Sequence, residues 1–182
     1  ERDGSRPDPL LRSNAIVGDV VGVTGHFGGA GAGLRLLTGT GDKRPSAGLM
    51  KALLRPVPRV SEGRVLREEG VRAAIDVSDG LLSDLGRVCG AGGLSAVVDA
   101  SAVPVHEDVH LCFSLDETLE IALSGGEDYE LLFTAPAEVV ERVAARVETP
   151  VSVIGRLVPG HPGGVIVEGR DGVPVEISSS GW

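Results

Sequence analysis

Asp76, Ser78 and Asp79 interrupt an apolar run near the middle of the segment AAIDVSDGLLSDL, residues 73–85, before Leu81 and Leu82 resume it. Asp76 and Ser78 stand at the end of a predicted strand, two residues apart, so both side chains point to the same face, and Asp79 lies on the following turn. Mg²⁺ is commonly held by one or two carboxylates together with substrate phosphates. The start of the next helix adds backbone N–H groups that favour anions. The segment therefore suits one part of a metal and phosphate site.

A simpler interpretation of the same segment involves no chemistry. Asp79 and Gly80 would form a turn, and Ser78 or Asp79 would cap the helix that follows. This interpretation does not account for Asp76, whose carboxylate would be costly to bury without a partner. The pattern alone leaves both interpretations open.

A second candidate segment is SGGEDYELLF, at residues 124–133. Its two glycines allow the backbone to approach a ligand closely, and Glu127, Asp128 and Glu130 precede an apolar strand. A helix C-cap at Gly125 followed by a polar turn explains the same letters, and on pattern alone it is the simpler explanation.

Other residue types that often carry chemistry form no motif here. The glycine-rich segment HFGGAGAGLRLL lacks a GK[ST] ending, and Gly29, Gly31 and Gly33 do not have the GxGxxG spacing, so it predicts tight helix packing. The four histidines have no ligand spacing, and no nucleophile motif is present. Cys89 and Cys112 match no metal or redox spacing, which favours a reduced, cytoplasmic setting.

Composition limits the classes of partner. The chain has 182 residues, of which 42% are hydrophobic and 24% charged, enough to bury a sizeable core. A net charge of −9 argues against binding nucleic acid or an anionic membrane surface, but not against anionic substrates bridged by a metal. The polar N-terminal segment indicates no signal peptide, and no apolar run approaches transmembrane length.

Apolar periodicity and turn residues place these segments on predicted elements. Strands are predicted over residues 19–25, 72–78, 94–100, 129–135, 151–158, 164–169 and 173–178. Helices are predicted from the glycine-rich segment to residue 37 and over residues 47–55, 60–69, 80–90, 116–123 and 136–147. In the helix over 60–69, Val60 and Val65 or Leu66 are expected to share the inner face.

The order of these elements predicts an α+β fold, with one mixed β-sheet and helices packed on it. The last three strands come in succession, separated by glycine-rich turns, and are expected to form a meander. Residues 1–18 contain Pro7 and Pro9 and no periodicity, so they are predicted to be a linker, and residues 19–182 the folded domain.

Taken together, the segments resemble the thiamine-monophosphate kinase family. Five segments occur in the order found in that family, from about Leu10 to Trp182. They are GDVVGVTG with its glycine-rich helix start, LLRPVPRV, AAIDVSDGLLSDL, LSGGEDYELLFT and a final GW. The SDGL and GGEDYEL segments discriminate best within the wider superfamily. The resemblance implies a fold like the C-terminal domain of aminoimidazole ribonucleotide synthetase.

The resemblance also implies an activity, the Mg²⁺-dependent transfer of the ATP γ-phosphate to thiamine monophosphate, which gives thiamine diphosphate. By matching positions, it implies that Asp76 and Asp79 bind Mg²⁺ and that Ser78 contacts ATP. Arg12, in LLRSNAIVGD, is the best match for a further ATP contact, although the family usually has a small residue where Asn14 stands.

The thiamine substrate is implied to contact Glu127 and Trp182. No catalytic general base is expected, because phosphoryl transfer depends mainly on alignment and charge neutralisation.

The family's N-terminal domain, with its acidic GDD-type segment, has no counterpart in these 182 residues. The resemblance therefore implies a C-terminal domain, preceded by the end of a linker, that forms one wall of a cleft between domains and is inactive alone. The intact enzyme is expected to be a cytoplasmic homodimer that associates through the missing domain. The alternatives are another ATP-dependent enzyme of the superfamily and a non-catalytic binding module derived from one.

Overall fold

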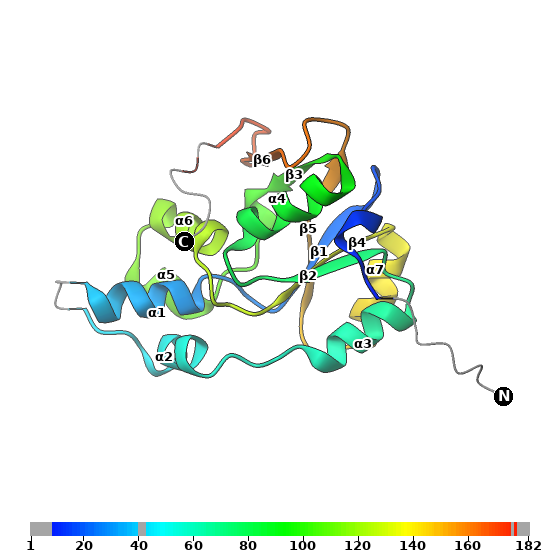
Figure 1. Cartoon of the computed structure of the whole chain (residues 1–182). Helices are drawn as coiled ribbons and strands as arrows, with labels where there is room; N and C mark the ends of the chain where they lie inside the picture. Colours follow the sequence, from blue (N-terminus) through cyan, green and yellow to red (C-terminus); the bar gives the residue numbers. More distant parts are fainter. Residues whose placement is uncertain (1–8, 40–42, 176, 178–182) are drawn as a thin grey trace.

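The computed structural model describes residues 9–39, 43–175 and 177 (Figure 1). Trp182 and residues 1–8 therefore lie outside the described residues. Within the described part, no helix is both long enough and apolar enough to cross a membrane.

A six-stranded mixed sheet forms the centre of the described chain, with the strand order β2-β4-β1-β5-β3-β6. The β3–β6 pair is parallel and the other four pairs are antiparallel. The strands are β1 Val20–Thr24, β2 Ala73–Asp76, β3 Ser95–Asp99, β4 Leu131–Ala135, β5 Val151–Val158 and β6 Val165–Glu168. The predicted α+β architecture is confirmed.

Seven α-helices surround this sheet in the described residues (Figure 1). They are α1 Gly29–Thr38, α2 Ala47–Leu54, α3 Val60–Glu68, α4 Leu81–Gly92, α5 Glu107–Cys112, α6 Leu115–Ser124 and α7 Ala137–Ala144. Two short 3₁₀ turns, η1 Arg12–Asn14 and η2 Ala100–Ala102, complete the order. The short helix α5 has no counterpart among the predicted elements.

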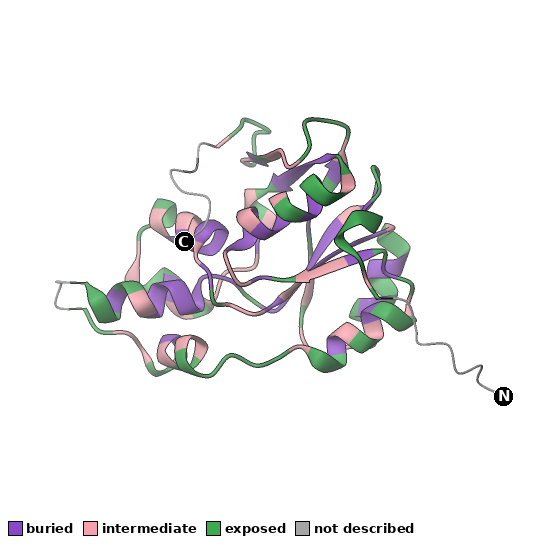
Figure 2. Ribbon diagram, viewed as in Figure 1, coloured by how far each residue is buried: buried purple, intermediate pink, exposed green. Residues whose placement is uncertain are grey.

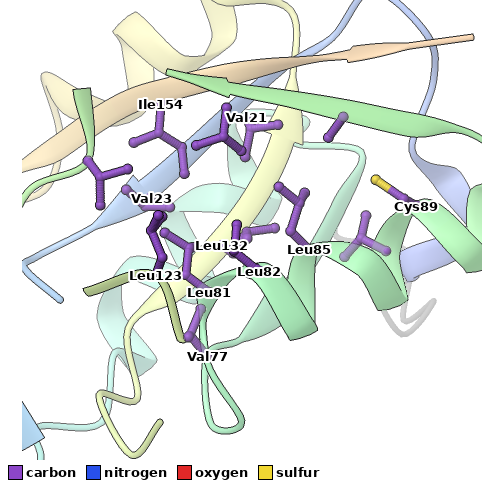
Figure 3. Packing of buried hydrophobic residues seen from close by; sticks show 14 of the residues in the cluster. Val21, Val23, Val77, Leu81, Leu82, Leu85, Cys89, Leu123, Leu132 and Ile154 are labelled. Atoms are coloured by element: carbon purple, nitrogen blue, oxygen red, sulfur yellow. The ribbon is translucent and has the colours of Figure 1, made fainter. Parts of the chain in front are cut away.

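Both faces of the sheet are covered. In β4, the successive residues Leu132 and Phe133 are both fully buried but belong to different apolar clusters, because neighbouring side chains of a strand point to opposite faces. Leu132 packs in the larger cluster, in which Leu81 and Leu85 of α4 face the sheet (Figure 3). Phe133 packs in the cluster that includes residues of α3 and α7. Buried residues accordingly line the strands and the inner sides of the helices (Figure 2).

The expected meander of the last three strands is wrong. β5 pairs with β1 along one edge and with β3 along the other, so neither edge is free for β6. β6 instead extends the sheet beyond β3, in parallel. In the described part of 173–178, a single bridge joins Pro174 to Glu168. The glycine-rich turns favoured pairing between strands that are adjacent in sequence. In the structure, however, β5 pairs only with strands from earlier in the chain, β1 and β3.

Two smaller expectations also needed correction. Val60 does not share the inner face of α3, since it is 60% exposed while Leu66 is fully buried. The strands predicted over 72–78 and 129–135 are shorter than expected, because β2 ends at Asp76 and β4 begins at Leu131. The polar residues of both candidate segments therefore lie mainly in irregular backbone at the ends of two paired strands.

Candidate functional site

The two candidate segments, about fifty residues apart in sequence, lie side by side and are joined through their backbones. The Val77 N–H donates to the Glu130 carbonyl (2.8 Å), and the Tyr129 N–H donates to the Val77 carbonyl (2.9 Å). The Glu127 N–H donates to the Ser78 carbonyl (2.9 Å). These bonds continue the antiparallel pairing of β2 with β4 beyond the strand ends. The fold thus brings the SDGL and GGEDYEL segments into one site.

Gly80 sets the direction of the loop between β2 and α4. Its φ of 118° lies in a region that residues with a side chain rarely adopt. A Cβ at this position would also lie 2.6 Å from the Ser124 carbonyl oxygen at the end of α6. The loop can therefore pass this close to α6 only because residue 80 is glycine.

Asp84 is a functional candidate that the sequence reasoning missed. Its fully buried carboxylate accepts hydrogen bonds from the backbone N–H groups of Ser78 and Asp79, each at 3.0 Å, through Oδ2. Oδ1 accepts from Arg87 at 2.6 Å. Helical spacing in the sequence could have identified Asp84 as buried, because position 84 shares the apolar face of the helix with Leu81 and Val88. A carboxylate on that face indicates a buried polar role.

These bonds decide how the turn is capped. The N-cap residue of α4 is Gly80, and no side chain caps it. The backbone N–H groups of Ser78 and Asp79 are satisfied from within the helix, by Asp84. Neither Ser78 nor Asp79 is therefore used as the helix cap that the simpler interpretation required, and both side chains remain at the surface of the site.

Asp79 is half-exposed and forms an ion pair with Arg87, whose guanidinium also holds Asp84. The Ser78 hydroxyl donates to Asp79 Oδ1 at 3.3 Å. The hydrogen bond from Arg87 is the main cause of a lowered pKa at Asp79, and the one from Ser78 contributes. Asp79 is thus an ionised carboxylate with a cation already beside it.

Asp76 ends strand β2, at the edge of the sheet, and its side chain is exposed. The burial cost that favoured a functional role for Asp76 in the sequence therefore does not apply. Its exposed position leaves the carboxylate accessible to a ligand.

Glu127 and Tyr129 both have left-handed backbone, with φ of 68° and 51°, and they are the non-glycine residues of the described chain that do so. Such strain persists only where surrounding contacts enforce it, and it concentrates at functional sites. The Tyr129 hydroxyl donates to the Glu127 carboxylate at 3.1 Å.

The phenol of Tyr129 lies in a negatively charged environment. The pKa of its phenol is raised, first by the hydrogen bond to Glu127 and then by the negative charges of Glu127, Asp76 and Asp79. Three predicted site carboxylates, one from the GGEDYEL segment and two from the SDGL segment, thus act on one hydroxyl group.

The remaining carboxylates of the second segment point into the protein and hold the fold. Asp128 accepts hydrogen bonds from the N–H groups of Gly28 (2.9 Å) and Ala30 (3.4 Å) at the start of α1, and burial raises its pKa to about 7. The buried Glu130 accepts from Arg59 at 2.6 and 2.7 Å and from Thr24 at 2.7 Å. Of this acidic group, Glu127 is exposed, Asp128 is partly buried and Glu130 is buried.

The glycine-rich segment packs α1 tightly, as its pattern predicted. A Cβ at Gly29 would lie 3.0 Å from the side chain of Ala52, and one at Gly33 would lie 2.8 Å from the Leu49 carbonyl oxygen, both on α2. At the end of α6, Gly125 is the C-cap, as the simpler interpretation of that segment expected.

The last two predicted contacts are not brought into the site by the described structure. Arg12 is exposed in η1, which packs against β2 and α4, the elements on either side of residues 77–80. In the part of the chain that the structure describes, no hydrogen bond or ion pair joins Arg12 to these carboxylates, so its role stays a prediction. Trp182 lies outside the described residues.

A metal would find a partial ligand set here. In the described ranges, no group of three His, Cys, Asp or Glu side chains is arranged to hold a metal ion. Asp76 and Asp79 offer accessible carboxylates, and Arg87 shows that the second of them accommodates a cation. This donor set fits Mg²⁺ as part of a site whose other ligands are substrate phosphates or further protein groups.

Comparison with known proteins places this geometry in a family. The family model described as AIR synthase related protein, C-terminal domain, matches residues 17–168. Thiamine-monophosphate kinase of Escherichia coli K12 is 36% identical over 179 residues, which are 95% of this chain and 54% of that protein.

Solved structures give the same result. The crystal structure of thiamine-monophosphate kinase from Stenotrophomonas maltophilia K279a has 37% sequence identity and a TM-score of 0.80, and the match covers 91% of this chain and 54% of that one. AaThiL complexed with AMPPCP and TMP has 30% identity and a TM-score of 0.76, over 94% of this chain and 52% of that one. The chain spans about half the length of the curated relatives it matches. It belongs to the family of AIR synthase related proteins, as their C-terminal domain.

Proposed function

We propose that this chain is the C-terminal half of a thiamine-monophosphate kinase, which transfers the γ-phosphate of ATP to thiamine monophosphate and forms thiamine diphosphate. The observation that carries the proposal is the set of backbone hydrogen bonds between residues 77–78 and 127–130, which holds the segment of Asp76 and Asp79 beside the segment of Glu127. The identity to thiamine-monophosphate kinases supports it, as does the solved relative complexed with AMPPCP, an ATP analogue, and TMP.

Each residue has a role that suits its chemistry. Asp76 and Asp79 would hold Mg²⁺, which supplies neutralisation of the charge on the transferring phosphate. The Ser78 hydroxyl and the Arg12 guanidinium would contact ATP, and Glu127 would contact the thiamine substrate, with Trp182 as its partner beyond the described residues.

The other residues of the site position these groups. Asp84 fixes the backbone of Ser78 and Asp79, and Arg87 orients the Asp79 carboxylate. We assign no general base, because the phosphate acceptor is already ionised. The same proposal includes a cytoplasmic location and a homodimer that associates through a domain absent from this chain. Both follow from the sequence argument given above.

The test is product formation by the purified gene product that carries this sequence. With ATP, MgCl₂ and thiamine monophosphate, we expect thiamine diphosphate, measured by chromatography after oxidation to the fluorescent thiochrome. Omitting MgCl₂, or adding EDTA, should abolish the product. ATP hydrolysis with no thiamine diphosphate would instead indicate another ATP-dependent enzyme of the superfamily. No ATP turnover and no ATP binding would support a non-catalytic module.

A further inference from the structure

Arg87 on α4 joins two carboxylates that differ in their surroundings. Its Nη1 donates to Oδ1 of Asp84 at 2.6 Å, and its Nη2 donates to Oδ2 of Asp79. Asp84 is fully buried, whereas the side chains of Asp79 and Arg87 are 47% and 44% exposed. A guanidinium can serve two acceptors at once because its donors form a rigid, planar fork. A proposed metal ligand and the carboxylate that fixes its loop therefore share one cation.

The bond between Arg87 and Asp84 is the durable part of this arrangement. The two residues are three positions apart on α4, so they are neighbours on one side of the helix. Asp84 Oδ2 accepts from the backbone N–H groups of Ser78 and Asp79, which leaves Oδ1 for the guanidinium. A buried carboxylate that loses its partner pays a large desolvation penalty. Arg87 should therefore stay bonded to Asp84 whatever happens at Asp79.

The bond between Arg87 and Asp79 is the exchangeable part. An ion pair between groups that are both close to half-exposed is weak, because water solvates either partner well. Asp79 Oδ1 accepts from the Ser78 hydroxyl at 3.3 Å, so both oxygens of this carboxylate already have a donor. A divalent cation at Asp79 would bring two positive groups to one carboxylate, where they repel each other. The flexible side chain of Arg87 can relieve that repulsion by turning Nη2 toward solvent.

We propose that Arg87 is the resident counter-cation of this site, which releases Asp79 when Mg²⁺ binds and remains bonded to Asp84. The inference rests on the proposed function, in which Asp79 is a metal ligand. Within the described residues, no other lysine or arginine forms a hydrogen bond or ion pair with Asp76 or Asp79. Arg87 would thus set how tightly the site holds Mg²⁺, because binding of the metal has to replace an existing contact.

A purely structural role for Arg87 predicts the opposite effect on metal binding. If the guanidinium only oriented Asp79 for the metal, its removal would misplace a ligand and weaken the binding of Mg²⁺. If the guanidinium competes with the metal, its removal frees a carboxylate oxygen and strengthens the binding. The direction in which the Kd for Mg²⁺ changes therefore decides between the two roles.

Calorimetric titration of the purified gene product with MgCl₂, without nucleotide, measures this direction independently of turnover. In Arg87→Gln, we expect the Kd for Mg²⁺ to fall about fivefold. Adding Asp79→Asn to that variant should abolish the gain, because the gain requires the freed carboxylate. A Kd for Arg87→Gln that is unchanged or higher than in the wild type would overturn the proposal.

Arg64→Gln is the matched control for the loss of one positive charge. Arg64 is exposed on α3, and its side chain forms no hydrogen bond or ion pair with any residue that the structure describes. The Kd for Mg²⁺ should change by less than about twofold in this variant. A gain as large as that of Arg87→Gln would mean that net charge alone is responsible, and the exchange at Asp79 would be rejected.

A measurement on the wild type keeps the test valid if Arg87→Gln fails to fold, which thermal unfolding would reveal. In protein labelled with ¹⁵N-arginine, the guanidinium signal of Arg87, assigned by its absence from Arg87→Lys, should shift when MgCl₂ is added. KCl at the same ionic strength should leave it in place. A signal that does not move at saturating MgCl₂ would show that Arg87 keeps Asp79, against the proposal.

The outcomes also separate this inference from the proposed function. If the wild type forms thiamine diphosphate but Arg87→Gln weakens the binding of Mg²⁺, Arg87 orients its neighbour and the function stands. If Asp79→Asn leaves the Kd for Mg²⁺ unchanged, Asp79 is no metal ligand, and the exchange fails with that assignment. If the wild type forms no thiamine diphosphate while Arg87→Gln still binds Mg²⁺ more tightly, the proposed function fails and the exchange is upheld.

Discussion

At the scale of single residues, the site separates accessible carboxylates from carboxylates that hold the fold. Asp76, Asp79 and Glu127 are accessible, while Asp84, Asp128 and Glu130 are turned toward backbone N–H groups or an arginine. The difference is visible in burial and in partners, and it predicts different outcomes for substitutions that remove one negative charge at nearly constant shape.

Asp76→Asn and Asp79→Asn should lower turnover by about a hundredfold or more, because each removes a carboxylate expected to bind the Mg²⁺ that would neutralise the phosphate charge. Their stability should change little, since both side chains reach solvent and surface substitutions usually stay within about 0.5 kcal/mol. Steady-state kinetics over a range of MgCl₂ concentrations and urea unfolding measure the two effects. Normal activity of both variants at low Mg²⁺ would contradict the metal assignment.

Asp84→Asn, in contrast, should lower the free energy of unfolding. The buried carboxylate accepts two backbone bonds and pairs with Arg87, so the variant places an amide N–H₂ against donors. We expect a loss of about 1–3 kcal/mol in the free energy of unfolding. Ser83→Ala, on the same helix, serves as a control. A stability equal to that of the wild type would show that Asp84 does not hold the loop.

At the scale of elements, the loops between strands and helices carry the site, and one glycine and one aspartate fix how these loops pack. Gly80 lets the loop before α4 pass the end of α6, and Asp128 joins the second loop to the start of α1. Each contact connects segments that are distant in sequence, so each should be sensitive to a small change.

Gly80→Ala should lose about 1–3 kcal/mol from backbone strain alone, and more from the clash with the Ser124 carbonyl. Gly70→Ala is a matched comparison, since Gly70 also has a positive φ (81°) but has nothing within 4 Å of an added Cβ. Urea unfolding should rank Gly80→Ala as the less stable variant. Equal stabilities would mean that the close approach to α6 costs nothing.

Asp128 should make stability depend on pH. Burial raises its pKa from 3.8 to about 7, so between these values the folded state binds a proton that the unfolded state has lost. Its contribution is fully present below the unfolded pKa and is lost as pH rises toward 7, with a slope of at most about 1.4 kcal/mol per pH unit. Asp128→Asn should remove this part of the slope, as measured by urea unfolding from pH 4.5 to 8. An unchanged slope would contradict the assignment.

The sequence was sufficient to predict where most helices and strands lie. It failed to predict features that depend on contacts between segments distant in the chain. Apolar periodicity located most helices and strands, because each buries one face. It could not show that β3 would insert between β5 and β6, since strand pairing depends on which edges are free. The site followed the same rule: matching motifs pointed to Asp76, Asp79 and Glu127, but the left-handed backbone at Tyr129 and the bonds of Asp84 depend on contacts between segments.

At the scale of the molecule, we propose that the chain offers one surface of a larger site. Asp76 and Asp79, the proposed metal ligands, would form an incomplete ligand set within the described residues, and the curated relatives are about twice as long. Apolar side chains such as Leu54, Val57 and Val60 stay exposed along the segment beside the site, which suggests that further groups cover this side when substrates are bound.

The 182-residue chain alone should therefore form no thiamine diphosphate, while a longer gene product containing it should. Phosphoryl transfer needs both substrates aligned and their charge neutralised from several sides, which this surface alone does not provide. Parallel thiochrome assays at equal protein concentration make the comparison. Turnover by the short chain would contradict the proposal that it is one half of the active site.

The edge strand β2 has a consequence for solubility. It is only four residues long, and charged, exposed side chains stand at both limits, Arg72 before it and Asp76 at its end. A short strand bounded by charge is a poor template for another chain to extend into an aggregate. The carboxylate proposed to bind a metal would thus also protect the sheet from growing, and a mutant that replaces Asp76 with an apolar residue would become both inactive and prone to aggregation.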